Sequence, residues 1–262
     1  MQAAVKSVWG TVAARALQGR GAGGDGTVYV DSVAEAAVVR VLEEEHAAGR
    51  NFQLISEEVG ERSFGEGGDV IVVDPIDGSH NAKMGIPYFS LTLAAASDRT
   101  FGSVHEASVR NLVTGDDFRA VAGGGTTLNG VPCVLDPAGD SHINIAQFEP
   151  ARLEENLDLW IDLMRQAEKV RMLGSAALNI CLVASGSLSI SVAPSLRSVD
   201  CAAPLLILRE AGGIATDLDG APIDQLDMGL ANRTSVLAAA NRAVHDMALS
   251  TINAARSIRP GA

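Results

Sequence analysis

The spacing of apolar residues changes several times along the chain and predicts an alternation of helices and strands. In the first part, helices are predicted over residues 3–17 and from Asp31 or Ser32 onward, where Ser32 and Glu35 have the spacing of a capping box. Short apolar or alternating runs then predict strands, at residues 52–55, 70–73, 89–95, 103–113 and 118–121. The last two of these strands are expected to be antiparallel neighbours.

The second part of the chain alternates more regularly. Residues 153–167 predict a helix, because their apolar side chains form one stripe, namely Leu153, Leu157, Trp160, Ile161 and Met164. Further helices are predicted over residues 175–184, at about 201–211 before the Gly212-Gly213 stop, and from Arg242. Strands are predicted at residues 142–147, 170–173, 188–192, 214–217 and 236–239. Helices interleaved with strands throughout indicate a layered α/β or α+β architecture.

The composition is that of an acidic globular chain. Of its 262 residues, 47% are hydrophobic and 20% are charged, so the chain can bury a sizeable core as one domain or as two closely joined lobes. Its formal net charge of −12 argues against binding to nucleic-acid backbones or to anionic membranes. An acidic chain that binds an anionic substrate needs cations to offset the repulsion, which favours metal ions at the site.

Cysteine usage and the N-terminal residues bear on the compartment. Cys133, Cys181 and Cys201 are widely spaced and odd in number, so neither a disulfide framework nor a thiolate zinc site is expected, and a reducing cytoplasm is the simplest setting. No run approaches the roughly 18 apolar residues of a membrane span, and no membrane association is expected. The first twenty residues lack acids, as organelle transit peptides do, but an amphipathic first helix has the same composition.

The apolar run over residues 70–73 ends abruptly in a segment that contains two aspartates, Asp74-Pro75-Ile76-Asp77-Gly78-Ser79-His80-Asn81. Pro75 fixes its own φ and Gly78 permits a close backbone approach, so the two carboxylates can point to one place. Mg²⁺ prefers oxygen ligands, which Asp74, Asp77 and the carbonyl of Ile76 would supply. The alternative is a solvated turn that caps a following helix.

The other candidate metal-binding acids can also be explained without a metal. Glu57 and Glu58 follow the strand at residues 52–55, so they join the first cluster if the two strands are neighbours, but exposed glutamates need no such role. Asp200 is compatible with a helix N-cap, and so is Asp31 beside Ser32. His80, at a probable helix start, is expected to cap or face solvent rather than bind metal.

The order of these segments along the chain resembles the inositol monophosphatase family of lithium-sensitive phosphatases. The matching segments run from about Asp31 to Asn241 and comprise Ser56-Glu57-Glu58, Asp74 to Asn81, Gly123 to Pro132, Gly174 to Asn179, Asp200-x-Ala202-Ala203 and Glu210 to Gly213. The resemblance implies a layered αβαβα sandwich of the sugar-phosphatase type. It also implies a single catalytic unit over residues 1–262, with a metal-binding α+β lobe at 1–139 and an α/β lobe at 140–262 that completes the substrate pocket.

The resemblance further implies a role for each matching residue. Two to three Mg²⁺ ions would be bound by Glu57, Asp74, the Ile76 carbonyl, Asp77 and Asp200. A metal-activated water would attack the phosphate, with Asp31, Glu57 and Ser79 as catalytic residues, and Ser79 here replaces the more usual threonine. Substrate contacts would come from Asp77, Gly78, Ser79, His80, Gly174, Ser175, Arg197 and Asp200. A Gly-Ser helix cap at Gly174 and Ser175 would look identical.

Substrate preference is less well defined. In inositol-selective relatives a glutamate precedes the last metal aspartate by seven residues, and here that position is Ala193. The Arg197-x-x-Asp200 spacing is closer to the archaeal-type dual-activity branch. The expected reaction is hydrolysis of a small phosphorylated metabolite, inositol 1-phosphate or a sugar phosphate such as fructose 1,6-bisphosphate, by a homodimer. The alternatives are a 3′-phosphoadenosine 5′-phosphate nucleotidase and a non-catalytic metal-binding regulatory protein.

Overall fold

Helices and sheets alternate along the whole of the described chain. The computed structural model describes residues 2–22, 26–148 and 153–258. The helices are α1 (Gln2–Lys6), α2 (Tyr29–Ala47), α3 (Ser79–Met84), α4 (Leu153–Gln166), α5 (Ala176–Ala184), α6 (Ser198–Glu210), α7 (Arg242–Ile258) and the 3₁₀ turns η1 (Ala13–Arg15) and η2 (Phe101–Ser103). None of these helices is both long and apolar enough to cross a bilayer.

The first large sheet has eight strands among the described residues, in the order β10-β9-β8-β7-β6-β5-β3-β4. They are β3 (Phe52–Ser56), β4 (Gly60–Phe64), β5 (Asp69–Asp77), β6 (Ser90–Ala96), β7 (Val104–Asn111), β8 (Asp117–Val121), β9 (Gly125–Leu128) and β10 (Val131–Cys133). Within this sheet β3 and β5 are parallel, whereas the other neighbouring pairs are antiparallel. A separate hairpin, β1 (Leu17–Arg20) and β2 (Gly26–Val28), precedes α2.

Within the part of the chain that the structure describes, the second large sheet has five strands in the order β12-β11-β13-β15-β14. They are β11 (Ile143–Phe148), β12 (Ala167–Arg171), β13 (Ile190–Arg197), β14 (Ile214–Thr216) and β15 (Arg233–Ala239). Its parallel pairs, β11 with β12 and β11 with β13, have a helix between their strands, as parallel connections require.

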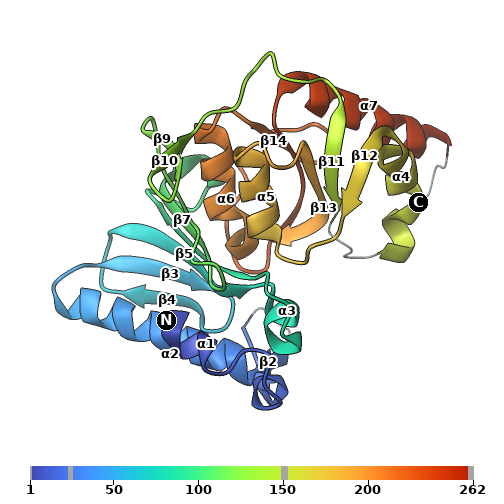
Figure 1. Cartoon of the computed structure of the whole chain (residues 1–262). Coiled ribbons are helices and arrows are strands. Elements are labelled where there is room, and N and C mark those ends of the chain that lie inside the picture. Colours follow the sequence, from blue (N-terminus) through green and yellow to red (C-terminus); the bar gives the residue numbers. More distant parts are fainter. Residues whose placement is uncertain (1, 23–25, 149–152, 259–262) are drawn as a thin grey trace.

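The two sheets sandwich a pair of helices (Figure 1). Helix α2 packs on the outer face of the first sheet, α5 and α6 lie between the sheets, and α4 and α7 cover the outer face of the second. Helices buried on both sides are expected to be apolar all round, and eight of the nine residues of α5 are buried. The predicted layered αβαβα sandwich is confirmed.

The outer helices are amphipathic, as predicted for α4. Trp160 and Leu163 are fully buried, and the Trp160 ring lies 5.7 Å from that of Phe148 on β11. Ile161 and Met164 are half-buried, and the side chains of Leu153 and Leu157 lie outside the described residues. Because α4 covers one face of a sheet, only its inward stripe needs to be apolar.

The predicted helix over residues 3–17 is wrong. Helix α1 ends at Lys6, and the chain then turns through Gly10 at φ +70° before β1. A side chain at Gly10 would also meet the Cα of Gly85 at 3.1 Å, so two glycines allow the backbones to cross closely here. The hydroxyl of Thr11 donates to the Val8 carbonyl, a local bond that competes with helix continuation.

Helix α2 begins earlier than the predicted capping box places it. Its first residue is Tyr29, and the cap is Asp31, whose Oδ2 accepts the Val28 N–H at 3.2 Å. Glu35 instead accepts the Ser56 hydroxyl at 3.1 Å and so ties α2 to β3.

The strands β4, β9 and β10 were not predicted, because β4 is mostly exposed and the other two are short.

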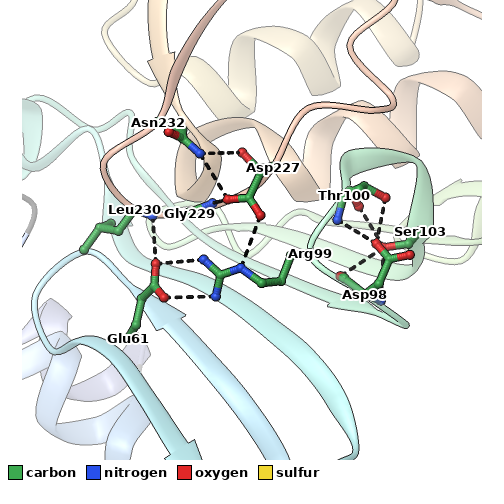
Figure 2. Close-up of polar contacts among 9 residues, drawn as sticks. All are labelled: Glu61, Asp98, Arg99, Thr100, Ser103, Asp227, Gly229, Leu230 and Asn232. Atoms are coloured by element: carbon green, nitrogen blue, oxygen red, sulfur yellow. Dashed lines mark hydrogen bonds and ion pairs between the residues drawn. The ribbon is translucent and has the colours of Figure 1, made fainter.

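Arg99 joins the first sheet to the segment before β15 (Figure 2). Its guanidinium donates two bonds of 2.9 Å to Glu61 on β4 and one of 3.3 Å to Asp227. Glu61 also accepts the Leu230 N–H at 3.2 Å, and the Arg99 carbonyl accepts the Met228 N–H at 2.7 Å. A bidentate arginine fixed in this way contributes more than a single exposed ion pair.

The first prediction concerns this network. Arg99→Met is expected to lower the free energy of unfolding by about 1–2 kcal/mol, because it removes the two bonds to Glu61 and the bond to Asp227. Arg40→Met is the control, since Arg40 makes a single exposed contact of 3.8 Å with Glu44 on α2, and it should cost less than about 0.5 kcal/mol. Urea unfolding measures both, and equal losses would contradict the prediction.

Candidate metal centre and active site

The acids of the candidate site stand at one edge of the first sheet. Strand β3 is the parallel neighbour of β5, with Ser56 opposite Val73. The next residues, Glu57 and Asp74, therefore emerge side by side at the carboxyl ends of the two strands, where α/β proteins commonly place their sites. Pro75 and Ile76 continue β5 through an irregular pairing with β6, which gives this edge its bend.

A third acid reaches the same place from helix α6. Asp200 is the third residue of α6, and its Oδ2 accepts the Arg197 N–H at 2.9 Å, so it caps the helix from inside rather than as the N-cap residue. One carboxylate oxygen from each of Glu57, Asp74 and Asp200 lies within 4.8 Å of the others. This convergence of three acids is the central feature of the site.

Burial and mutual repulsion make this cluster electrostatically costly. Burial, and then the charge of Asp200, raises the pKa of Glu57 to about 8. Burial, and then the charges of Glu57 and Asp200, raises the pKa of Asp74 well above its usual range. Converging carboxylates of this kind fit Mg²⁺, which takes oxygen ligands and cancels the repulsion.

Thr92 links the two elements that carry Asp74 and Asp200. Its buried hydroxyl accepts the Asp74 N–H at 3.2 Å and donates to the Val199 carbonyl in α6 at 2.8 Å. The threonine therefore fixes α6 against β5 beside the acids. No sequence pattern singled out Thr92, because a buried threonine in an alternating strand looks like any other β-branched residue.

Asp77, an expected metal ligand, is not one of the converging three among the described residues. Its carboxylate accepts the N–H groups of Ala176 and Ala177 at 3.1 and 3.0 Å, and the hydroxyls of Ser175 and Ser90. Asp77 thus caps α5 from the neighbouring sheet, together with Ser175. Burial, and then the charge of Asp200, raises the pKa of Asp77 to about 7.

A cavity of about 50 Å³ opens beside the acids. It is lined by Gly26, Asp31, Glu57, Glu58, Asp74, Pro75, Ile76 and Ser79, so it brings together the three residues expected to be catalytic. Burial raises the pKa of Asp31 to about 6. The Oδ1 atom of Asp31 is buried and has no hydrogen-bond partner in the described structure, which leaves it able to bind a water or a hydroxyl.

The backbone after Asp77 turns tightly toward the second lobe. Gly78 has φ +91°, and a Cβ there would lie 2.8 Å from the Gly174 carbonyl oxygen, so only glycine fits. Asn81 donates to the carbonyls of Tyr88 and Leu173, both at 2.7 Å, and holds the same junction. Gly78, the first of the expected phosphate donors, therefore lies next to Gly174 and Ser175, whereas the side chain of His80 is exposed.

Arg197, which is expected to contact substrate, pairs with one of the acids. Its guanidinium forms an ion pair with Glu57, and its side chain is 7% exposed. The sequence contained Arg197 but gave no sign of this partner, because the two residues are 140 positions apart and come from different lobes.

Comparisons with known proteins identify the family of this chain. The sequence profile of the inositol monophosphatase family matches residues 2–257. A fructose-1,6-bisphosphatase/inositol-1-monophosphatase of Methanothermobacter thermautotrophicus is 33% identical, over 96% of this chain and 92% of the relative. The chain belongs to the inositol monophosphatase family. The family match and the phosphatase names of its relatives support a phosphoric monoester hydrolase.

Two other relatives extend the comparison. A bifunctional NADP phosphatase/NAD kinase of Methanococcus maripaludis is 31% identical over 83% of this chain, and the match spans 41% of that longer protein. A solved inositol monophosphatase-fructose 1,6 bisphosphatase superposes with a TM-score of 0.82 at 24% identity, covering 95% of both chains, which shows the shared fold. The resemblance seen in the sequence is therefore confirmed.

The position that differs from inositol-selective members of the family is buried. Ala193 on β13 is 4% exposed and belongs to the apolar core between the sheets. The pairing of β13 with β15 is irregular between Ala193 and Leu196, so the backbone bends just before Arg197. The position at which the resemblance led us to look for a glutamate therefore carries a small apolar side chain within the core.

The second prediction uses Glu35, whose pKa burial raises to about 7. Because the folded pKa lies above the unfolded value of 4.5, folding binds protons, and stability falls as the pH rises from about 4.5 to about 7. Glu35→Gln in the metal-free chain is expected to raise the free energy of unfolding by about 2 kcal/mol at pH 8, with a smaller gain at pH 5. Urea unfolding at both pH values measures this.

The matched control is Glu44→Gln, an exposed position on the same helix. It should change stability by less than about 0.5 kcal/mol at either pH. A Glu35→Gln variant whose gain did not depend on pH would show that the buried carboxylate is not the cause.

Proposed function

We propose that this chain hydrolyses small phosphate monoesters with Mg²⁺ held by Glu57, Asp74 and Asp200. The observation that carries the proposal is the convergence of these three carboxylates within 4.8 Å, from two different lobes. The carbonyl of Ile76, beside the same cavity, and Asp77 would complete the ligands of two to three ions. Bound Mg²⁺ supplies neutralisation of the phosphate charge and activation of the attacking water.

The remaining cavity residues have distinct roles in this proposal. The unpartnered Oδ1 of Asp31 and the hydroxyl of Ser79 orient the water, and Asp31 is suited to accept a proton because its pKa is raised to about 6. Glu57 supports the same water while it holds metal. The N–H groups of Gly78, Ser79 and His80 are assigned to the phosphate oxygens.

The proposed substrate is inositol 1-phosphate or a sugar phosphate such as fructose 1,6-bisphosphate. The name of the Methanothermobacter thermautotrophicus relative supports both. Gly174, Ser175 and Asp77, which Ser175 links by a hydrogen bond, are assigned to the alcohol part of the substrate. Arg197 at the end of β13 and Asp200 in α6 are assigned to the same part. Ala193 offers no charged group to inositol hydroxyls, which favours the sugar phosphate.

A second candidate is a phosphorylated nucleotide such as 3′-phosphoadenosine 5′-phosphate. The relative named NADP phosphatase/NAD kinase supports this candidate, since its name includes removal of a nucleotide phosphate.

A non-catalytic metal-binding regulatory role is the third candidate. The presence of Asp31, Glu57, Asp74, Asp200 and a hydroxyl at Ser79 argues against it, because an inactive site has no need of all five.

The deciding experiment is a phosphate-release screen with and without Mg²⁺. It compares inositol 1-phosphate, fructose 1,6-bisphosphate and 3′-phosphoadenosine 5′-phosphate at equal concentration. The expected result is Mg²⁺-dependent release from one or both of the first two. Release from the nucleotide alone would favour the second candidate, and no release from any would favour the regulatory role.

Light scattering tests the expected homodimer, and metal analysis tests the expected two to three ions.

The third prediction tests the metal ligands directly. Asp74→Asn is expected to reduce phosphate release at least about 100-fold, because it removes one charge from the converging three. The same change should raise the Tm of the metal-free chain, because it relieves repulsion among buried acids, and should abolish the rise in Tm caused by Mg²⁺. Calorimetry and the phosphate assay measure these effects.

Asp69→Asn is the matched control, since Asp69 begins the same strand and is exposed. It should leave turnover and the Mg²⁺ response within about two-fold of the unchanged chain. Asp77→Asn is a poorer test, because it also weakens the cap of α5. Full turnover in Asp74→Asn would rule out the proposed metal centre.

A further inference from the structure

Arg197 makes contact with two of the three converging acids at once. Its guanidinium pairs with Glu57, and its backbone N–H donates to Asp200 Oδ2 at 2.9 Å. Its Cα lies where β13 ends and α6 begins, and it pairs in register with Arg233 of β15. The backbone of Arg197 is therefore fixed, and its side chain enters the acid cluster from the second lobe.

The charge of this guanidinium matters because the surroundings oppose ionisation of Glu57. Burial and the charge of Asp200 raise the pKa of that carboxyl, and the charge of Arg197 acts against both. Arginine stays protonated at any physiological pH, so the ion pair is not broken by deprotonation of the guanidinium. The side chain is also almost fully shielded from water, which makes its charge less screened than that of a surface arginine.

A metal ion and a guanidinium compete for the same oxygen atoms. Glu57 has two carboxylate oxygens, and Arg197 contacts Oε1. A cation shared with Asp74 and Asp200 has to approach Glu57 from inside the cluster, where like charge from the guanidinium repels it. This ion pair therefore opposes the binding of Mg²⁺ to the same carboxylate.

We propose that Arg197 is an internal counter-cation that occupies the acid cluster without metal and lowers its affinity for Mg²⁺. This inference rests on the proposed function, because it concerns the same three acids. Arg197 holds Glu57 toward Asp200 in the metal-free chain and gives up this contact when the ion binds. A purely positioning arginine would have the opposite effect, since its loss would weaken Mg²⁺ binding.

The test is calorimetric titration of Mg²⁺ into the full chain at pH 8, without substrate. Arg197→Met is expected to bind Mg²⁺ about ten-fold more tightly than the unchanged chain, and its metal-free form should melt at a lower temperature. Arg233→Met is the matched control, since it removes the same charge from the paired position on the next strand. That variant should change the Kd less than about two-fold.

Equal or weaker Mg²⁺ binding by Arg197→Met overturns the proposal, and so does an equal gain in Arg233→Met. If Arg197→Met does not fold by circular dichroism, Arg197→Gln is titrated in its place with the same expectation. Failure of the unchanged chain to bind Mg²⁺ overturns the proposed function as well, whereas normal binding and turnover with an unaltered Kd in the variant overturns only the role of Arg197.

Discussion

Repulsion among buried carboxylates at the junction of the two sheets is the constraint on which the rest of the site depends. One carboxylate oxygen from each of Glu57, Asp74 and Asp200 lies within 4.8 Å of the others. Besides burial, the charge of Asp200 raises the pKa of Glu57, and the charges of Glu57 and Asp200 raise the pKa of Asp74. A fold tolerates such a cluster only if its surroundings hold it together rigidly. The supports are the paired ends of β3 and β5, the Thr92 hydroxyl between β5 and α6, and the guanidinium of Arg197.

The doubly buried helices explain how acids from distant parts of the chain meet. Helices α5 and α6 have apolar surfaces toward both sheets, so they are fixed by packing on two sides. Their first turns then point at the edge of the first sheet, where Asp77 caps α5 and Asp200 stands in the first turn of α6. The aspartates at the N-terminal ends of α5 and α6 therefore stabilise these helices and also belong to the candidate site.

Much of this arrangement was predictable from the sequence, for identifiable reasons. The apolar run before Asp74 and the helix pattern of α5 are local signals, and the fold class followed from their alternation. The prediction of one helix over residues 3–17 was wrong, because helix propensity does not reveal the close crossing of Gly10 and Gly85. That contact joins segments 75 positions apart, which spacing rules do not describe.

The candidate site was likewise only partly predictable from the sequence. Glu57, Asp74 and Asp200 were found because their order resembles a known family, and the structure brings them together. The cap of α5 by Asp77, the bridge at Thr92 and the pairing of Arg197 with Glu57 were missed. Each is a contact between lobes, formed by residues whose types are common in any turn or strand, so only the three-dimensional structure identifies them.

The parallel register of β3 and β5 has a consequence for how this chain tolerates change. Ser56 stands opposite Val73, and side chains alternate between faces along a strand. A slip of β3 by one residue would turn Glu57 to the opposite face and break the cluster, whereas a longer or shorter turn beyond β4 leaves the pairing intact. Insertions and deletions should therefore accumulate between β4 and β5, while the number of residues from Phe52 to Glu57 stays constant.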